Sequence, residues 1–186
     1  MAEPALRQMS LSEFLSWERS QEYRYEYDRG VITAMTGGTL DHNDPAFNLR
    51  RELGDKLREA GCRAYSENAK VRGGAAIYYP DIVVTCRPVD GHADEVVDPV
   101  LIAEVMSDTT EAADRGRKWL QYKKLAALQY YLLVSQQEAR IELFTRQGDL
   151  WIVSEVAGLD GIVALPALKI TIALSTVYER TSLAAG

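Results

Sequence analysis

The chain has 186 residues, of which 47% are hydrophobic and 26% charged. This composition excludes a disordered or collagen-like chain and is typical of a folded protein, so we expect one domain over residues 1–186. No apolar run approaches the roughly 18 residues needed to cross a bilayer, and the first twenty residues lack the features of a secretory signal. We therefore expect a cytoplasmic protein that does not enter a membrane.

Charge is unevenly distributed along the chain. The net charge of −6 disfavours a general nucleic-acid coat protein. Residues 88–108 contain six acidic side chains and neither Lys nor Arg, whereas residues 50–72 and 111–124 are each basic. This pattern fits either a cation site beside two basic segments or, more simply, an acidic loop and two solvated helix faces.

Two cysteines, Cys62 and Cys86, are too few for a disulfide scaffold and lack metal-ligand spacing. Neither has an obvious base to activate it. We expect both to be small buried residues of a protein in a reducing compartment.

The first third of the chain predicts a helix, a hairpin and a second helix. Residues 10–19 begin with serines that can cap a helix, and residues 23–35 form a hairpin turning at Asp28-Arg29-Gly30. The second helix is predicted to start at Asp44, with Pro45 in its first turn and Gly61 at its C-terminal end. Its buried stripe consists of Leu49, Leu53 and Leu57, which recur every four residues.

The middle of the chain predicts strands over 64–72, 77–86 and 101–106. Pro80 places the start of the second strand near an edge or an entry point. The third strand is apolar on both faces apart from Glu104, as in strands covered on both sides. A helix over 109–127 and a buried strand over 130–134 follow.

The last third predicts a hairpin of strands 140–146 and 150–155 around Gln147-Gly148-Asp149. Short strands near 162–164 and 169–172 and a final helical turn complete the chain. This order of elements predicts a mixed α/β or α+β domain built on one sheet. We expect strands 77–86, 101–106 and 130–134 to share that sheet, with helix 109–127 packed on it.

Glu104 and Asp81 are the candidate metal ligands. An unpaired carboxylate in the apolar strand 101–106 would cost several kcal/mol, so Glu104 needs a cation, a metal or a basic side chain. Asp81 precedes a β-branched run in the neighbouring strand, and we expect the two carboxylates to lie within about 5 Å of each other, as oxygen ligands of Mg²⁺ do. The simpler alternative is that Glu104 pairs with Lys or Arg and Asp81 caps a strand end.

Lys118 lies on the helix face that we expect to pack on the sheet. It shares that face with Trp119 and Tyr122. We expect its ammonium to reach within about 6 Å of Glu104, where the opposite charge keeps it protonated. The alternative is a lysine whose stem covers apolar surface while its ammonium reaches water.

Other chemistries lack their residues. His42, at the entrance to the second helix, could face the same cavity as a ligand or simply begin the helix, and His92 belongs to the acidic loop. Gly37-Gly38 and Gly73-Gly74 do not form a phosphate-binding loop, and no serine lies in a Gly-x-Ser-x-Gly turn.

These motifs together resemble the putative restriction endonuclease domain family of the PD-(D/E)XK nuclease superfamily. The resemblance rests on Pro80-Asp81, on Glu104 in an apolar strand, and on the segment from Ser107-Asp-Thr-Thr through Asp114 and Lys118 to Tyr122. It extends to Tyr25-Glu26-x-x-x-Gly30, to His42 at the start of a helix, to Gln129-Tyr-Tyr-Leu-Leu-Val and to Trp151 in the final hairpin. It implies a restriction-endonuclease-like mixed sheet flanked by helices, with an added N-terminal hairpin and C-terminal strands.

One position departs from the superfamily pattern, because Met106 stands where the lysine two residues after the acid is expected. The resemblance implies that Lys118 replaces it. By the same resemblance Asp81 and Glu104 are catalytic metal ligands, helped by the Val105 carbonyl and by His42 as a further candidate ligand, and Lys118 orients water or stabilises charge. Candidate contacts to the nucleic-acid backbone are Arg50, Arg51, Lys56, Arg115 and Arg117.

We therefore expect a Mg²⁺-dependent endonuclease, with Mn²⁺ as a possible substitute, that hydrolyses phosphodiester bonds in nucleic acid, preferably DNA. The alternative is a catalytically weak or inactive nuclease fold that serves as a nucleic-acid-binding or assembly module. The acidic net charge favours the alternative, whereas Asp81, Glu104 and Lys118 together favour the enzyme. A homodimer is a possible assembly.

Overall fold

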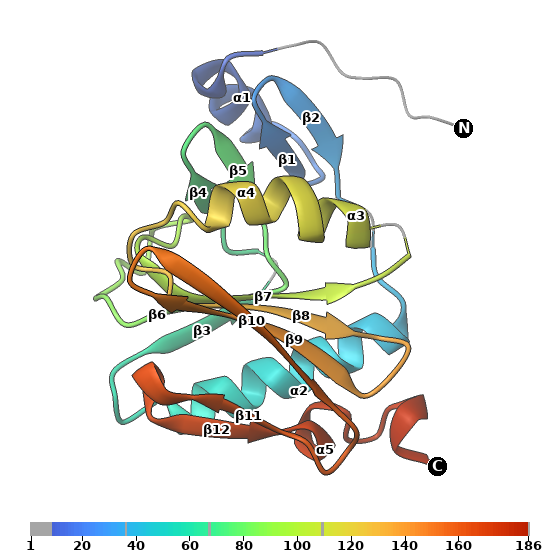
Figure 1. Cartoon of the computed structure of the whole chain (residues 1–186). Helices are drawn as coiled ribbons and strands as arrows, with labels where there is room; N and C mark the ends of the chain where they lie inside the picture. Colours follow the sequence, from blue (N-terminus) through green and yellow to red (C-terminus); the bar gives the residue numbers. More distant parts are fainter. Residues whose placement is uncertain (1–8, 36, 67, 109, 186) are drawn as a thin grey trace.

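A six-stranded mixed sheet forms the centre of the computed structural model, which describes residues 9–35, 37–66, 68–108 and 110–185 (Figure 1). Its strand order is β10-β9-β8-β7-β6-β3, and β7 and β8 are parallel while the other neighbours are antiparallel. The strands are β3 (Arg63–Ser66), β6 (Ile82–Thr85), β7 (Pro99–Met106), β8 (Tyr130–Ser135), β9 (Arg140–Gln147) and β10 (Leu150–Ala157).

A smaller four-stranded sheet and the first helix stand at the N-terminal end of the molecule (Figure 1). The sheet has the order β2-β1-β5-β4 and consists of β1 (Tyr25–Asp28), β2 (Val31–Ala34), β4 (Val71–Gly73) and β5 (Ala76–Tyr78). The predicted β1–β2 hairpin is confirmed, and positive φ angles at Arg29 (49°) and Gly30 (96°) give the turn that matches strand twist. The predicted first helix is α1 (Leu11–Glu18), capped by Ser10.

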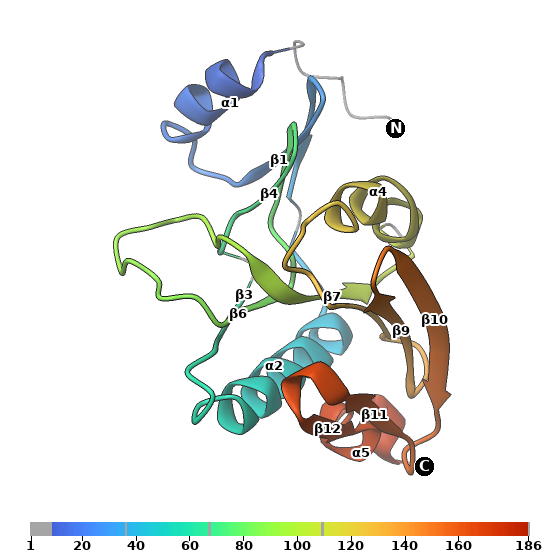
Figure 2. The same cartoon turned by 60° about the vertical axis from the view of Figure 1, so that its left-hand side comes forward.

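Helices cover both faces of the central sheet (Figures 1 and 2). One face carries α2 (Leu40–Lys56), α5 (Leu174–Val177) and the hairpin of β11 (Ile162–Leu165) and β12 (Ile170–Ala173). The other carries one irregular helical segment: α3 (Glu111–Ala113), the π-helix η1 (Asp114–Lys118) and α4 (Trp119–Tyr122). Two 3₁₀ turns, η2 (Pro166–Leu168) and η3 (Ser182–Ala185), complete the chain.

Strand β7 separates the hydrophobic cores on the two faces of the central sheet because its side chains alternate between those faces. Leu101, Ala103 and Val105 pack in the core under α2. Ile102 and Met106 belong to the core on the α4 side. Glu104 lies between them in sequence, two residues from each, and therefore projects from the same face of the strand. Its carboxylate points into the space between the sheet and the η1 segment.

The prediction of one sheet is wrong, because two predicted strands are each divided between sheets. The segment 77–86 breaks at Tyr79–Asp81, so that β5 joins the N-terminal sheet and β6 the central one. Pro80 lacks the N–H needed to continue a ladder, which explains the break. The segment 64–72 is divided in the same way into β3 and β4. As predicted, β6, β7 and β8 share a sheet with the helical segment packed against it.

Both long helices differ from their predicted bounds. Helix α2 begins before Asp44, at Leu40, because the Thr39 hydroxyl accepts the N–H of His42 (3.3 Å) and caps the helix. Pro45 therefore lies in the second turn, and the helix ends at Lys56, ahead of Gly61. The helix predicted over 109–127 ends at Tyr122 and contains the five-residue π-helix.

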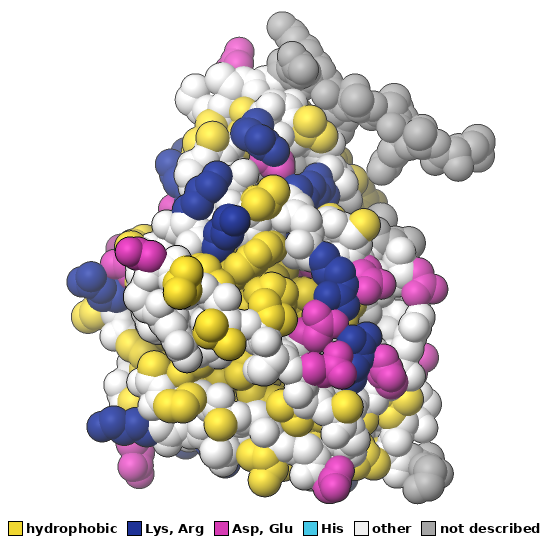
Figure 3. All heavy atoms as spheres, viewed as in Figure 1, with side chains coloured by type: hydrophobic (Ala, Val, Ile, Leu, Met, Phe, Trp, Pro, Cys, Tyr) yellow, Lys and Arg dark blue, Asp and Glu magenta, His cyan; other side chains and the backbone are white. Residues whose placement is uncertain are grey.

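Exposed charges are grouped on the face seen in Figure 1. Lys and Arg side chains gather over the N-terminal four-stranded sheet, whereas basic and acidic side chains mix beside the central sheet (Figure 3). Within the described part of the chain, no helix is long and apolar enough to cross a membrane.

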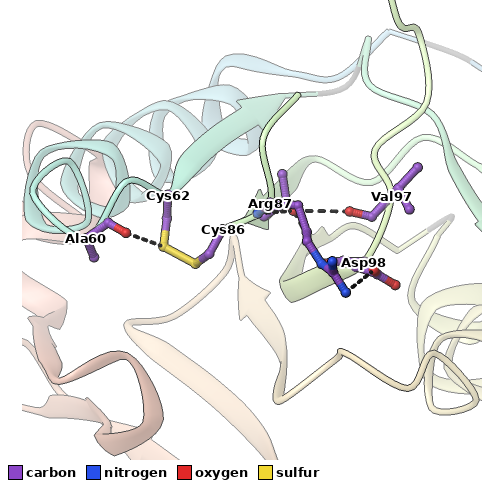
Figure 4. Close-up of a disulfide and its surroundings, with 7 residues drawn as sticks. Ala60, Cys62, Cys86, Arg87, Val97 and Asp98 are labelled. Carbon is purple, nitrogen blue, oxygen red and sulfur yellow. Dashed lines mark hydrogen bonds and ion pairs between the residues drawn. A yellow bond between two sulfur atoms is a disulfide. The ribbon is translucent and has the colours of Figure 1, made fainter. Parts of the chain in front are cut away.

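Cys62 and Cys86 form a disulfide bond, which corrects the prediction of two separate buried thiols (Figure 4). The bond joins the residue before β3 to the residue after β6, two strands that pair in register from Arg63 opposite Thr85. Cys62 is buried, but Cys86 is exposed. Spacing along the sequence could not reveal the pairing, because antiparallel strands bring the two residues together only in the folded sheet.

Candidate active site

A cavity of about 370 Å³ lies between the two sheets. Its walls come from the β1–β2 hairpin, the segment from Gly37 to His42, the start of β6, the end of β7 and the η1 helix. The break at Tyr79–Asp81 positions this cavity, because it sends the chain from one sheet to the other beside the end of β7. Elements far apart in the sequence therefore surround one polar space.

The Glu104 carboxylate lies at the cavity wall and is 2% exposed. Its Oε1 accepts a hydrogen bond from the Tyr122 hydroxyl (3.1 Å) and lies 3.2 Å from Lys118 Nζ. Its Oε2 accepts the backbone N–H of Asp81 (3.3 Å). Glu104 thus has the basic partner that its burial requires, and this partner is the predicted lysine.

Asp81 connects the start of β6 to the end of β7. Its Oδ2 accepts the N–H of Val105 (2.7 Å), and its Oδ1 lies 3.2 Å from His42 Nε2. Because the N–H and C=O of a strand residue point to the same side, the Val105 carbonyl also lies on the side of Asp81. His42 lines the cavity, one of the two roles that the sequence left open for it, and the early start of α2 places it in the first helical turn.

Lys118 is the central cation of the site. Its ammonium lies within 3.0–3.2 Å of carboxylate oxygens of Glu26, Glu104 and Asp114. The lysine ends the π-helix η1, and π-helical turns inside α-helices are frequent at functional sites. Its predicted approach to Glu104 is confirmed, and the alternative of a solvent-reaching lysine is wrong because Lys118 is only 7% exposed.

Carboxyl groups outnumber basic groups in this buried cluster. Burial raises the pKa of Glu104 well above its ordinary value, and Lys118 opposes the shift. Burial also raises the pKa of Asp114. For Lys118, burial acts to lower the pKa, but Glu104 and the other carboxylates outweigh it and hold the pKa above the ordinary value. The lysine is therefore charged, and it faces three carboxyl groups.

One cavity-lining oxygen, Gln136 Oε1, is buried without a hydrogen-bond partner among the residues that the structure describes, whereas Asp114 Oδ1 lies 3.1 Å from Lys118 Nζ. The same part of the chain contains no cluster of three or more His, Cys, Asp and Glu side chains arranged to hold a metal. Asp81 and Glu104 each bring a carboxylate to the cavity wall. Such a site fits Mg²⁺, which commonly binds one or two carboxylates and completes its coordination with water and substrate phosphates.

The predicted nucleic-acid contacts are scattered. Arg117 lines the cavity, 3.7 Å from Glu26. Arg115 instead pairs with Glu142 and Glu111 outside the cavity. The other three predicted contacts belong to α2, on the opposite face of the sheet: Arg50, Arg51 and Lys56. There Arg51 pairs with Glu179 and Lys56 with Glu52.

Sequence reasoning did not assign roles to three residues of the site. Glu26 approaches Lys118 from the N-terminal hairpin. Its position between two tyrosines in a predicted strand was the one feature of the sequence that could have indicated a role in the site. Asp114 stands four residues before Lys118, a spacing that joins side chains on a helix. Tyr122 stands four residues after Lys118 and donates its hydroxyl to Glu104.

The structure is a mixed sheet flanked by helices, with a buried lysine between carboxylates at a strand end, and this fold also occurs among known structures. The crystal structure of a putative nuclease belonging to DUF820 from Anabaena variabilis matches it with a TM-score of 0.77, covering 91% of this chain and 97% of that chain at 18% identity. The family model Uma2, described as "Putative restriction endonuclease", matches residues 11–176. The chain belongs to this family, as the sequence motifs predicted.

Two relatives of similar length come from Synechocystis sp. The uncharacterized protein slr1290 is 31% identical over 175 residues, which covers 92% of each chain. The uncharacterized protein sll1609 is 28% identical over 173 residues, covering 87% of this chain and 95% of that protein.

Proposed function

We propose that the protein is a metal-dependent endonuclease that hydrolyses phosphodiester bonds in DNA. The observation that carries this proposal is the meeting of Asp81, Glu104 and Lys118 at one cavity from a strand start, a strand and a helix. Membership of the Uma2 family and the likeness to the fold of a nuclease support the same activity.

Asp81 and Glu104 are the proposed ligands of Mg²⁺, or of Mn²⁺ in its place. The Val105 carbonyl and His42 are proposed as further ligands, since both lie on the side of Asp81. When bound, the ion would polarise a phosphoryl oxygen and lower the pKa of a water ligand. It would also supply the positive charge that this carboxylate-rich cavity lacks.

The chain's own residues prepare the site for that chemistry. Lys118, kept protonated by its carboxylate neighbours, would orient the attacking water or stabilise charge that grows on the phosphate. The Tyr122 hydroxyl donates to one oxygen of Glu104 and the Asp81 N–H to the other, which fixes the orientation of the carboxylate. Glu26 and Asp114 hold the Lys118 ammonium in place.

Arg117 is the strongest candidate for a contact to the nucleic-acid backbone, because it combines a cavity position with partial exposure of its side chain (32%). Arg50, Arg51, Lys56 and Arg115 would contact nucleic acid only outside the cavity. We propose the cytoplasm as the compartment in which the enzyme meets DNA.

Calorimetry of Mg²⁺ and Mn²⁺ binding, followed by nicking of supercoiled plasmid, tests the proposal. We expect wild type to bind both ions and to nick DNA in a manner that EDTA abolishes. Asp81→Asn and Glu104→Gln should lose both properties. Asp90→Asn is a matched control, because Asp90 is an exposed acid of the loop after β6 and does not line the cavity.

Absence of ion binding in wild type would contradict the proposed function. Ion binding without cleavage of DNA would favour the alternative of a binding or assembly module. Parallel assays with single-stranded RNA of matched length would show whether the substrate is DNA or RNA.

A further inference from the structure

Strand β10 is an edge strand with little of the usual protection. It has eight residues and pairs with β9 on one side, while the strands of the described residues leave its other side open. Figure 2 places it at the outer side of the molecule. Edge strands expose free N–H and C=O groups, which proteins usually guard with lysine, proline, a bulge or a short strand. The β10 sequence, LWIVSEVA, contains no lysine or proline and a single charged residue, Glu155, and its register with β9 is uninterrupted.

The opposite edge of the same sheet is different. Strand β3 has only four residues. The disulfide between Cys62, just before β3, and Cys86, just after β6, fastens the two strands together. A short, anchored strand offers little to pair with. The contrast singles out β10 as the edge open to association.

Apolar side chains are exposed along β10. Leu150, Ile152 and Val153 are 68%, 45% and 57% exposed. Hydrophobic side chains also cover much of the front of the space-filling view, around the region that β9 and β10 cross (Figure 3). A strand that is both unpaired and apolar is suited to extending the sheet with another strand.

The phase of the β9–β10 ladder decides which backbone groups are free. A two-residue turn joins Gln147 to Leu150, so this closing pair is hydrogen-bonded. Eight residues after Leu150, the N–H of Gly158 donates to the Ala139 carbonyl (2.8 Å). The same alternation of hydrogen-bonded and non-hydrogen-bonded pairs therefore holds at the far end of the hairpin. Even-numbered residues of β10 therefore bond to β9. The N–H and C=O of Trp151, Val153 and Glu155 point away from it.

This phase restricts how a second β10 strand can pair antiparallel with the first. A two-fold axis at Val153 pairs outward-pointing residues with each other and sets Glu155 of one copy opposite Trp151 of the other. The guanidinium of Arg146 lies 4.6 Å over the Trp151 ring, so the approaching carboxylate meets a positive charge. An axis at Ile152 would instead set Glu155 opposite Asp149, and like charges in that position are destabilising.

We infer that two copies of this chain associate through antiparallel pairing of their β10 strands about a two-fold axis at Val153. The two six-stranded sheets then form one continuous sheet of twice that width. The contact is isologous, as in most soluble dimers. It also covers the apolar side chains of Ile152 and Val153 on both copies. The inference does not depend on the proposed nuclease activity.

Site-specific crosslinking tests the register. In a hydrogen-bonded antiparallel pair the Cα atoms are about 5.5 Å apart, a distance that a disulfide can bridge. We expect Val153→Cys to give a covalent dimer under mild oxidation, with mass spectrometry locating the 153–153 link. Ile152→Cys is the matched control, because its two copies are diagonal neighbours about 7–8 Å apart and should link much less.

Sedimentation velocity tests the association itself. Wild type should sediment as a dimer, and Val153→Lys should be monomeric because two lysines would face each other across the axis. Val97→Lys makes the same change at a valine that is 63% exposed in the loop before β7, and it should remain dimeric. A monomeric wild type would overturn the inference. So would a Val153→Lys dimer, or equal crosslinking at positions 152 and 153.

Discussion

The ammonium nitrogen of Lys118 lies 3.2 Å from Oε1 of Glu104, a residue fourteen positions earlier in the chain. Strand β7 ends just after Glu104, and the helical segment that follows returns over the same face of the sheet to bring the lysine back. The position two residues after Glu104 holds Met106, which is buried in the core on that face. The fold therefore supplies from a helix the cation that this strand lacks.

Replacement of this lysine should affect both stability and activity. Lys118→Met retains much of the packing of the stem but leaves Glu26, Glu104 and Asp114 buried without their shared cation. We expect the free energy of unfolding to fall by about 3–5 kcal/mol at neutral pH, and nicking of DNA to be lost. Urea unfolding and the plasmid assay measure the two effects. Lys118→Arg should rescue little cleavage, because a planar fork does not replace a compact ammonium.

A double variant separates these two effects. Adding Glu26→Gln to Lys118→Met removes one uncompensated charge and should restore part of the stability without restoring cleavage. Lys123→Met, at a partly exposed lysine just after α4, should leave both properties unchanged. A Lys118→Met protein that cleaves DNA like wild type would show that the lysine is structural only.

A close glycine contact should control the orientation of His42. A Cβ added at Gly38 would lie 2.7 Å from Cδ2 of the His42 ring, whereas one added at Gly37 meets nothing within 4 Å. We expect Gly38→Ala to displace the imidazole from Asp81 and to weaken Mn²⁺ binding, while Gly37→Ala does neither. The chain has only two histidines, so NMR of the ring protons can follow His42 directly. Unchanged His42 resonances in Gly38→Ala would contradict this prediction.

The ion pair between Arg115 and Glu142 should make part of the stability depend on pH. Arg115 donates two hydrogen bonds to the carboxylate, and they lower the pKa of Glu142 below its ordinary value. A lowered folded-state pKa contributes stability above the unfolded-state pKa and loses it as pH falls through the folded-state value.

We expect Arg115→Met to reduce the free energy of unfolding by about 1 kcal/mol at pH 7. The difference from wild type should disappear in acid, once Glu142 is protonated in both states. Urea titrations over a pH series measure it. Arg58→Met breaks the pair with Asp55, in which both side chains are mostly exposed, and should have almost no effect at any pH. A difference that persists after Glu142 is protonated would show that Arg115 stabilises by packing.

The disulfide should contribute to stability and reveal the compartment. Cys62 and Cys86 are 24 residues apart in sequence, and a crosslink over a loop of this size typically contributes about 2–4 kcal/mol. Reduced wild type and the double variant Cys62→Ala, Cys86→Ala should lose similar stability in urea. Thiol counting on protein trapped in cells tests the cytoplasmic proposal, because a reducing cytoplasm keeps such cysteines as thiols. A protein found fully oxidised would argue against that compartment.

The local elements and the identity of the central site residues can be read from the amino-acid sequence. Alternation and turn residues were sufficient for the hairpins at Gly30 and Gly148, because strand pairing over two-residue turns is decided by neighbours in sequence. The cost of a carboxylate in an apolar strand singled out Glu104, and helix periodicity placed Lys118 on the buried face. A charged residue can be inferred to be buried from sequence alone when its neighbours along the strand are all apolar.

Which distant segments meet depends on the packing of the whole fold. The break at Pro80 distributes one apolar run between two sheets and thereby opens the cavity, and no local pattern reveals to which sheet a strand belongs. Glu26 forms an ion pair with Lys118, and Cys62 forms a disulfide with Cys86. In both cases the two residues are tens of positions apart in the sequence and meet only in the folded chain. Side-chain periodicity fixes the face that a residue presents, but the partner on that face depends on the packing of whole elements.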